Sequence, residues 1–400
     1  FDHKSSKFSA RYIRRGRLRP LSYERASQEL IGSSNAGLPY LVRKSAVLVD
    51  YTLSEIESNL GKYPAMLFTR TQEQGKTRNV WGFPIAETLY EMKWFKPYLE
   101  FEKTMPHRRA LLGPDSVDRA LSELVLKKES SGDKESLVCV DFTTFDASVS
   151  PLMSSRAFAN VASAFQNPSE FSELYRIFTT IGVITPEGEI TGWHGVPSGS
   201  AWTNTIDSEV QLIAAGSDKG KSVIPLGSCQ IQGDDGVYLI STDKVDELKR
   251  RFKDNGLKLN EEKTEVFTNA PEAIYLQRYY HPNYRTRAGY LGGVYSAYRA
   301  FARIKYLERF TNFSREGITG NDFFSLRTIM ILENCKHHPG FYDLVKLAFK
   351  YDRGGLKFSD QGLASFSRMM QSKSNAGVLH KEDISTGIDS FDTVKILRTL

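Results

Sequence analysis

Two adjacent aspartates, Asp234 and Asp235, stand between glycines near the middle of the chain, with apolar residues on both sides. This pattern predicts a β-hairpin with strands at 226–232 and 237–241. Its tip contains glycine and aspartate, for which left-handed backbone conformation costs little energy. Neighbouring carboxylates at a tip repel each other unless a cation lies between them. Such oxygen ligands suit a hard divalent cation, so the tip is a candidate metal site, although Asp-Asp-Gly is also ordinary turn chemistry.

Two further acids and a Gly/Ser loop precede the hairpin. Residues 137–142 form an apolar run that ends in an acid, Asp141, which predicts a buried strand delivering a carboxylate at its C-terminal end. Asp146 follows five residues later. The Gly/Ser-rich stretch that begins at Gly195 runs into an expected helix that ends near residue 215, and such a helix start suits an anion or a sugar hydroxyl.

A third feature is a cationic hairpin at 66–84, with Arg70, Lys76 and Arg78 around its polar tip. At strand spacing these three side chains point to one side. Cations on one face make sense mainly if an anion binds among them, whereas an ordinary solvated hairpin is the other interpretation.

The remaining pattern predicts the elements that carry these residues. Residues 1–25 are strongly basic, as a solvated arm or as a phosphate-binding one, and 33–40 read as a loop. Helices are expected at 53–60 after the N-cap Thr52, at 85–103 with a core-facing aromatic stripe, within 151–181, at 242–255 before Asn255-Gly256, and repeatedly from about 296. Strands are expected over Leu257–Lys263 and 273–281.

Composition narrows the class of protein. The net charge of +6 and the pI near 8.9 favour a polyanionic partner. Three scattered cysteines without a Cys-x-x-Cys spacing argue against a zinc site or a disulfide scaffold and for a reducing compartment. No apolar run approaches the ~20 residues that span a bilayer, which predicts no membrane partner. The start at Phe1, without Met, fits a processed or trimmed chain.

The order of these features indicates one chemistry, the joining of nucleotides. Two divalent ions about 3.5–4 Å apart clamp the attacking 3′-hydroxyl and the leaving pyrophosphate in such reactions. Carboxylates from two strands are needed because each ion is shared between protein and substrate phosphates. Cations on another element neutralise the triphosphate, since phosphoryl transfer depends mostly on positioning and charge stabilisation.

In this order and wording, residues 33–281 resemble the palm-type RNA-dependent RNA polymerases of RNA viruses. The wording is most similar to that of picobirnaviruses, whose genomes are double-stranded RNA, and next to that of partitiviruses. The matching motifs are Asp141-x4-Asp146, Ser198-Gly199-x3-Thr203-x3-Asp207, Gly233-Asp234-Asp235, Lys263, Leu276-Gln277-Arg278, the channel residues Lys76 and Arg78, and the template-entry loop Asn35–Tyr40.

The resemblance implies an α+β right hand with an antiparallel palm sheet flanked by helices. It implies fingers at 1–135 with the basic arm and at 151–191, palm at 136–150 and 192–284, and thumb at 285–400. It implies two Mg²⁺ ions, with Mn²⁺ as an alternative, held by Asp141, Asp234 and Asp235, and it adds Lys263 to the catalytic residues. The implied nucleotide-binding residues are Lys76, Arg78, Asp146, Ser198, Gly199, Thr203 and Asp207, and the implied RNA-binding residues are Asn35, Gly37 and Arg278.

One position departs from many relatives, which carry Asn where this chain has Asp207. The resemblance implies that the side chain at this position takes part in sugar recognition through a contact with Asp146. Two ionised carboxylates side by side repel each other. Either one is therefore protonated or Asp207 makes another contact. We expect Asp146 to accept from the 2′-hydroxyl while Thr203 donates to Asp146.

Two other classes fit less well. A reverse transcriptase typically has an aromatic residue before the two acids and a bulky steric gate, whereas Gly233 precedes Asp234 and Asp146 occupies the sugar-reading position. A non-catalytic RNA-binding or capsid protein would account for the charge but not for three carboxylates on the expected elements. The expected partners are template and product RNA, nucleoside triphosphates and a viral capsid protein, for a monomer in the virion interior and host cytoplasm.

Overall fold

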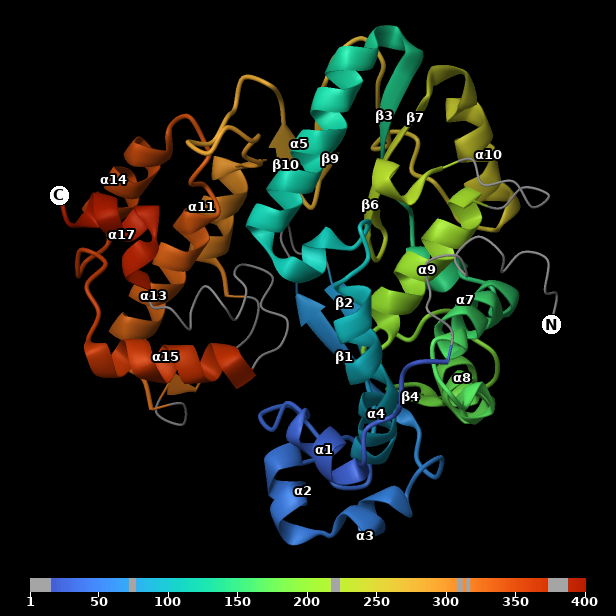
Figure 1. Ribbon diagram of the computed structural model, residues 1–400. Helices are drawn as coiled ribbons and strands as arrows, with labels where there is room; N and C mark the ends of the chain where they lie inside the picture. Colours follow the sequence, from blue (N-terminus) through green and yellow to red (C-terminus); the bar gives the residue numbers. More distant parts are fainter. Residues whose placement is uncertain (1–15, 72–76, 217–223, 308–311, 314–316, 373–387) are drawn as a thin grey trace. The chain divides into compact units, whose positions relative to one another are not determined.

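The computed structural model describes residues 16–71, 77–216, 224–307, 312–313, 317–372 and 388–400 (Figure 1). The strands are β1 (Ala65–Thr71), β2 (Thr77–Gly82), β3 (Glu135–Val140), β4 (Val183–Thr185), β5 (Gly188–Ile190), β6 (Cys229–Gln232), β7 (Asp235–Ser241), β8 (Glu265–Phe267), β9 (Ala273–Tyr275), β10 (Arg278–Tyr280) and β11 (Val294–Tyr295).

The α-helices are α1 (Tyr23–Gln28), α2 (Lys44–Asp50), α3 (Leu53–Glu57), α4 (Ile85–Glu102), α5 (Pro114–Ser131), α6 (Phe145–Ser148), α7 (Pro151–Ser163), α8 (Phe171–Thr180), α9 (Thr203–Gly216), α10 (Val245–Asp254), α11 (Ala297–Lys305), α13 (Gly320–Glu333), α14 (Phe341–Tyr351), α15 (Asp360–Ser372) and α17 (Asp392–Leu397). Short 3₁₀ helices are η3 (Arg109–Leu112), η4 (Gly132–Lys134), η5 (Pro168–Glu170), η6 (Leu226–Ser228), η7 (Thr242–Lys244) and η8 (Ile388–Ser390).

The chain divides into two compact units, and the first contains residues 1–69, 79–111 and 123–275. Its centre is an antiparallel sheet with the strand order β6-β7-β3-β8. Central strand β3 is buried over Ser136–Val140, as expected for an apolar run with a neighbour on each side. Helices α9 and α10 pack together, and α9 also packs on β6 (Figure 1).

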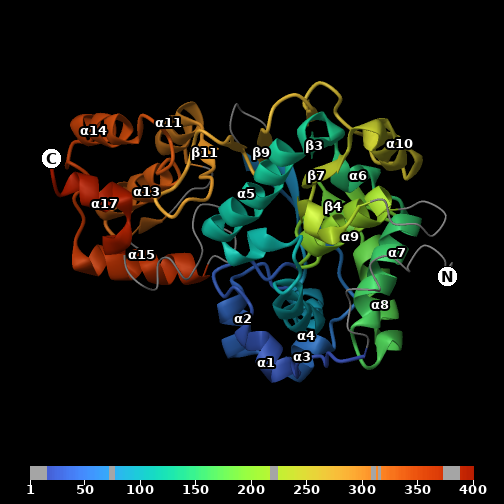
Figure 2. The ribbon, with the colours of Figure 1, turned by 45° about the horizontal axis from the view of Figure 1, so that its top comes forward.

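Helices α4, α7, α8 and α9 of the first unit share an aromatic core. Four large rings in this core are fully buried or nearly so and come from α4, from the segment after α7 and from the loop before α9: Trp94, Tyr98, Phe165 and Trp202. Helices α7 and α8 lie side by side in both views (Figures 1 and 2). The aromatic stripe of α4 is therefore core packing, as the sequence predicts.

The second unit contains residues 70–78, 112–122 and 276–400 and is mainly helical after residue 296. Its core joins α11, α13, α14 and α17, with Leu326, Ile329 and Val345 at 1% exposure or less. Glu333 on α13 accepts the Asp392 and Thr393 backbone N–H groups at 3.1 and 2.9 Å, so a buried acid caps the start of α17.

Several predicted elements are confirmed and two are wrong. Thr52 caps α3 with a complete capping box, and α4, α9 and α10 occur close to the expected ranges. The strand expected over Leu257–Lys263 is wrong, because Leu259 makes one isolated bridge to Phe142 and a turn follows. The run at 273–281 is two strands, β9 and β10, with Leu276 and Gln277 in left-handed conformation at φ 48° and 63° between them.

The helical expectation for 151–181 needs a smaller correction. Two α-helices, α7 and α8, replace one continuous pattern, with η5 at Pro168–Glu170 between them. Pro168 lacks a backbone N–H and restricts the residue before it, so the chain breaks and restarts at this position.

Candidate active site

Strand register brings the three predicted metal ligands to one end of the central sheet. Val140, the last residue of β3, pairs with Gly236 of β7, so the next residue, Asp141, lies at the level of Asp235. Gln232 pairs with Asp235 across the β6–β7 hairpin, which leaves Gly233-Asp234 as a two-residue turn. Asp234 is exposed, whereas Asp141 and Asp235 are half-buried. A cation from solvent can therefore reach this end of the sheet.

The turn depends on two glycines. Gly233 has φ +66°, a conformation that costs glycine little. At Gly236 a Cβ would overlap Oε1 of Gln211, so only glycine leaves room for that side chain. The Gly-Asp-Asp-Gly wording is therefore explained by backbone geometry as well as by the acids.

Lys263 lies in a turn that contacts the backbone of Asp141. The Asn260 N–H donates to the Asp141 carbonyl oxygen at 2.9 Å, and the Asp141 N–H donates to Thr264 Oγ1 at 3.3 Å. The Thr264 N–H closes the turn on the Asn260 carbonyl oxygen at 2.8 Å. Lys263 is exposed in this turn, which replaces the strand expected there.

The predicted sugar-sensing residues form a second group in the same unit. Asp146 lies on α6, and the Ser198 hydroxyl donates to its Oδ2. The Val196 N–H donates to the Asp146 carbonyl oxygen at 2.8 Å. The expectation that Thr203 donates to Asp146 is wrong in this structure: its hydroxyl lies 3.1 Å from the carbonyl oxygens of Pro197 and of Ser200.

Contacts from β2 and α4 hold the loop that carries Ser198. Gly199 has φ +142°, and a Cβ there would overlap the Trp81 carbonyl oxygen. Trp81 in turn donates its N–H to the Ser198 carbonyl oxygen at 2.7 Å. Glu91 on α4, which is 1% exposed, accepts the Ser200 hydroxyl and the Ala201 N–H, the latter at 3.0 Å. Glu91 was missed from sequence, although an acid inside an apolar helix face is a usable signal.

Asp207 is buried beneath these groups at 4% exposure, and its Oδ1 has no hydrogen-bond partner among the described residues. Burial raises the pKa of Asp207 well above its ordinary value, and the charges of Asp146 and Asp234 raise it further, against the opposing charge of Arg108. This direction supports the alternative in which Asp207 is protonated.

A buried polar network behind the Asp-Asp turn was also missed. The Arg108 guanidinium, 1% exposed, binds Glu102 at 2.8 Å, Asn204 Oδ1 at 2.7 Å and the Ser208 hydroxyl. No local motif marks Arg108, which lies about a hundred residues before its α9 partners. On α9 a signal exists, because Asn204, Ser208 and Gln211 recur at helical spacing on one face.

The remaining predicted residues have these positions. Arg78 is exposed on β2, and Lys76 lies outside the described residues. In the 33–40 loop, Asn35 Oδ1 accepts the Gly37 N–H at 2.8 Å, and a Cβ on Gly37 would lie 2.8 Å from the Phe83 carbonyl oxygen. Arg278 binds Asn334 Oδ1 at 2.8 Å within the second unit, a structural use of its guanidinium, while its RNA-binding role stays a prediction.

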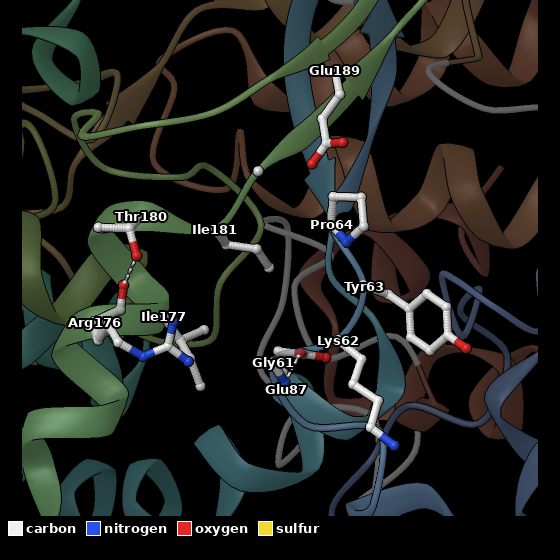
Figure 3. A pocket seen from close by; sticks show the side chains of 11 residues that line it. Gly61, Lys62, Tyr63, Pro64, Glu87, Arg176, Ile177, Thr180, Ile181 and Glu189 are labelled. Atoms are coloured by element: carbon white, nitrogen blue, oxygen red, sulfur yellow. Dashed lines mark hydrogen bonds between the residues drawn. The ribbon is translucent and has the colours of Figure 1, made fainter.

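A small cavity of about 160 Å³ also opens in the first unit, and none of the predicted site residues lines it (Figure 3). Glu87 at its wall accepts the Gly61 N–H at 2.8 Å, and burial raises the pKa of Glu87 to about 7. Arg176 faces the same cavity. Because the lining residues include none of the carboxylates at the sheet end, this cavity is a different place from the candidate metal site.

The donor set fits a metal shared with a substrate. Within the described ranges, no group of three or more His, Cys, Asp or Glu side chains could hold an ion by itself. Mg²⁺ in nucleotide-joining enzymes usually takes one or two carboxylates and completes its octahedral shell with phosphates and water. Half-buried and exposed carboxylates at one sheet end, Asp141 and Asp234, match that requirement.

In the described part of the chain, no helix is long and apolar enough to cross a membrane.

An antiparallel sheet with acids at one end is the arrangement expected of a polymerase palm, and family comparison agrees. Residues 55–292, more than half of the chain, match the family described as viral RNA-dependent RNA polymerase, so the chain belongs to this family. Polymerases of this family generally use divalent metal ions and act on an RNA template and nucleoside triphosphates.

Among its relatives, the chain is 28% identical over 346 residues to a potential RNA-dependent RNA polymerase of Human picobirnavirus (strain Human/Thailand/Hy005102), a match that covers 80% of this chain and 62% of that protein. The chain thus spans under two thirds of the length of this curated relative. A crystal structure of the RNA-dependent RNA polymerase of a human picobirnavirus matches with TM-score 0.82 and 26% identity, over 100% of this chain and 80% of that one.

A second solved structure, the insertion loop deletion mutant of the RNA-dependent RNA polymerase of a human picobirnavirus, matches with TM-score 0.80 over 100% of this chain and 79% of that one. At 24% identity this likeness bears on the fold alone. The α+β right-hand fold expected from the sequence is confirmed by these matches.

Proposed function

We propose that this chain is an RNA-dependent RNA polymerase that copies a viral RNA template by two-metal nucleotidyl transfer. Its biological task would be genome replication and transcription of a double-stranded RNA virus similar to picobirnaviruses. The observation that carries the proposal is the placement of Asp141 beside Asp234-Asp235 at one end of a buried sheet. Family membership supports the same activity.

Asp141 and Asp234 would hold Mg²⁺, or Mn²⁺ as an alternative, with Asp235 as a weaker ligand. When bound, two such ions lower the charge of the triphosphate and favour ionisation of the primer 3′-hydroxyl. Lys263 is exposed in the turn that contacts the Asp141 backbone. Its ammonium group would stabilise the negative charge of the leaving pyrophosphate and donate a proton to it. The exposed carboxylate of Asp234 leaves room for substrate phosphates at the same ions.

Asp146 would accept from the ribose 2′-hydroxyl, with Ser198 holding its carboxylate by hydrogen bond. Gly199 and Thr203 would shape that loop, and Asp207 would remain protonated beneath it. Lys76 and Arg78 would hold the triphosphate. The RNA-contacting set would be Asn35, Gly37 and Arg278.

The proposed division of the hand is fingers at 1–135 and 151–191, palm at 136–150 and 192–284, and thumb at 285–400. The chain would act as a monomer in the virion interior and host cytoplasm, with the viral capsid protein as a further partner.

The test is nucleotide incorporation on a primed RNA template with Mg²⁺. Asp234→Asn and Asp141→Asn keep side-chain size but remove a charge that the ion needs, so each should lower the rate by orders of magnitude in a folded protein. Asp235→Asn should have a milder effect. A rate above about a tenth of wild type, an effect under ~1.4 kcal/mol, in either of the first two variants would show that the metal assignment is wrong. Incorporation of deoxynucleotides alone would instead indicate a reverse transcriptase.

A further inference from the structure

We propose that Gln211 on α9 is a positioning residue that fixes the backbone of the Asp-Asp turn. It thereby fixes the position of the Asp234 Cα, from which the carboxylate side chain extends. Its Nε2 donates to two successive carbonyl oxygens of the turn, that of Gly233 at 2.9 Å and that of Asp234 at 3.0 Å. The inference rests on the proposed function, since positioning matters only if Asp234 binds a catalytic ion.

The amide has one orientation that satisfies all its partners. The Tyr238 hydroxyl donates to Gln211 Oε1 at 2.7 Å, which leaves Nε2 to face the turn. Gln211 and Tyr238 are both fully buried, so water does not compete for these bonds. Gly236, which lies opposite, has no Cβ that would displace Oε1. Every polar atom of the amide is thus engaged, either by the turn or by β7.

A second side chain from the same helix holds the other side of the turn. The Gly233 N–H donates to Ser208 Oγ at 2.7 Å, and Ser208 lies almost one helical turn before Gln211. Ser208 is itself bound by the Arg108 guanidinium, which the buried Glu102 carboxylate neutralises. The turn is therefore held through its N–H and its carbonyl groups by one rigid helix.

This support exceeds what a hairpin needs in order to fold. A two-residue turn with glycine in left-handed conformation forms without side-chain help, and Asp234 is exposed, so no burial of its carboxylate has to be offset. A metal ligand, by contrast, must stay within roughly 0.5 Å of its working position, which an unsupported hairpin tip does not achieve. Buried partners that orient a ligand usually change metal affinity or activity by about 10- to 100-fold when removed.

The experiment compares Gln211→Leu, which keeps the size but removes both donors and the acceptor, with Tyr238→Phe, which removes only the hydroxyl that orients the amide. Val210→Ala is the matched control, because Val210 is a fully buried neighbour on α9 whose truncation loosens packing and leaves the amide bonds intact. Three quantities decide the test on the full chain: hydrogen exchange of the peptide containing 230–238, Mn²⁺ affinity by electron paramagnetic resonance, and the Mg²⁺ concentration that gives half-maximal incorporation. The kcat, the nucleotide KM and Tm are measured beside them.

Gln211→Leu should speed hydrogen exchange in 230–238. It should weaken Mn²⁺ binding, and raise the Mg²⁺ concentration needed for half-maximal incorporation, each by about 10-fold or more. The kcat should fall, and the nucleotide KM should change little. Tyr238→Phe should change the same quantities less. Val210→Ala should lower Tm and leave exchange at 230–238 and both metal quantities as in wild type. Wild-type exchange and Mn²⁺ affinity in both Gln211→Leu and Tyr238→Phe would overturn the proposal, as would equal metal effects in Val210→Ala.

The outcomes also separate this inference from the proposed function. If wild type incorporates nucleotides but the Gln211 and Tyr238 variants behave like it, positioning fails while the polymerase assignment stands. If wild type incorporates none, the proposed function fails, and exchange and Mn²⁺ affinity still test the contact. If Gln211→Leu does not fold, Tyr238→Phe decides, since removing one hydroxyl keeps the core volume.

Discussion

The replacement Glu209→Gln should change how the stability of the first unit depends on pH. Glu209 lies on α9 at 3% exposure, and burial, together with the charge of Glu102, raises its pKa to about 7, against the opposing charge of Arg108. The Tyr98 hydroxyl donates to its Oε1 at 3.4 Å. A carboxylate in this position is costly to ionise, and the isosteric amide avoids that cost.

The magnitude follows from the two protonation equilibria. Because the pKa is raised from 4.5 to about 7 by folding, Glu209 contributes stability that is fully present below pH 4.5 and lost as the pH rises to about 7. Raising a pKa by this amount corresponds to about 3 kcal/mol. Glu209→Gln should therefore differ little from wild type near pH 5 and be more stable by up to about 3 kcal/mol at pH 8, or roughly 6 °C in Tm.

The assay is thermal and urea unfolding of both proteins at pH 5 and pH 8. Glu123→Gln is the matched control, because Glu123 is an exposed glutamate of the same unit and its replacement should stay within about 0.5 kcal/mol at both pH values. An equal stability difference between Glu209→Gln and wild type at pH 5 and pH 8 would refute the reasoning, since a buried, reluctantly ionised carboxyl requires the two to diverge.

Two further predictions concern the substrate. Arg78→Ala and Lys76→Ala should raise the nucleotide KM more than they weaken RNA binding, because two cations at this close sequence spacing suit a triphosphate. Equal loss of RNA affinity with an unchanged KM would move them to the template path. Asp146→Ala should slow ribonucleotide use more than deoxynucleotide use, whereas Asp207→Asn should be tolerated, since a protonated acid and an amide are alike. Single-nucleotide incorporation of GTP against dGTP measures this, and an unchanged ratio in Asp146→Ala would leave Asp146 a structural acid.

The parts of the site that could be predicted are those encoded by local pattern. The hairpin around Asp234 follows from glycines that flank acids between two apolar runs, and Asp141 follows from the apolar run that it ends. Antiparallel pairing then places both at one sheet end without further information. The strand expected over Leu257–Lys263 failed for the opposite reason: its pattern alternates, but backbone bonds to Asp141 bend it into a turn.

The supporting side chains could not be predicted, because their partners are distant in the sequence. Arg108 binds Asn204, which is 96 residues away, and Glu91 binds Ser200, which is 109 away. Neither pairing leaves a spacing rule in a single sequence. The donor to Asp146 was wrong for a related reason, since the loop at 198–203 turns so that Ser198, not Thr203, meets the carboxylate.

Helix α9 connects the two halves of the proposed chemistry. At its start Thr203 bonds the loop that presents Ser198 to Asp146, and further along Gln211 bonds the backbone of Asp234. Asp207 lies between these positions, and its pKa is raised by burial first and then by the charges of Asp146 and Asp234. A rigid helix that touches both groups cannot shift toward one without moving relative to the other. Sugar recognition and metal positioning would therefore be coupled through α9, and a substitution that shifts the helix as a whole should affect both.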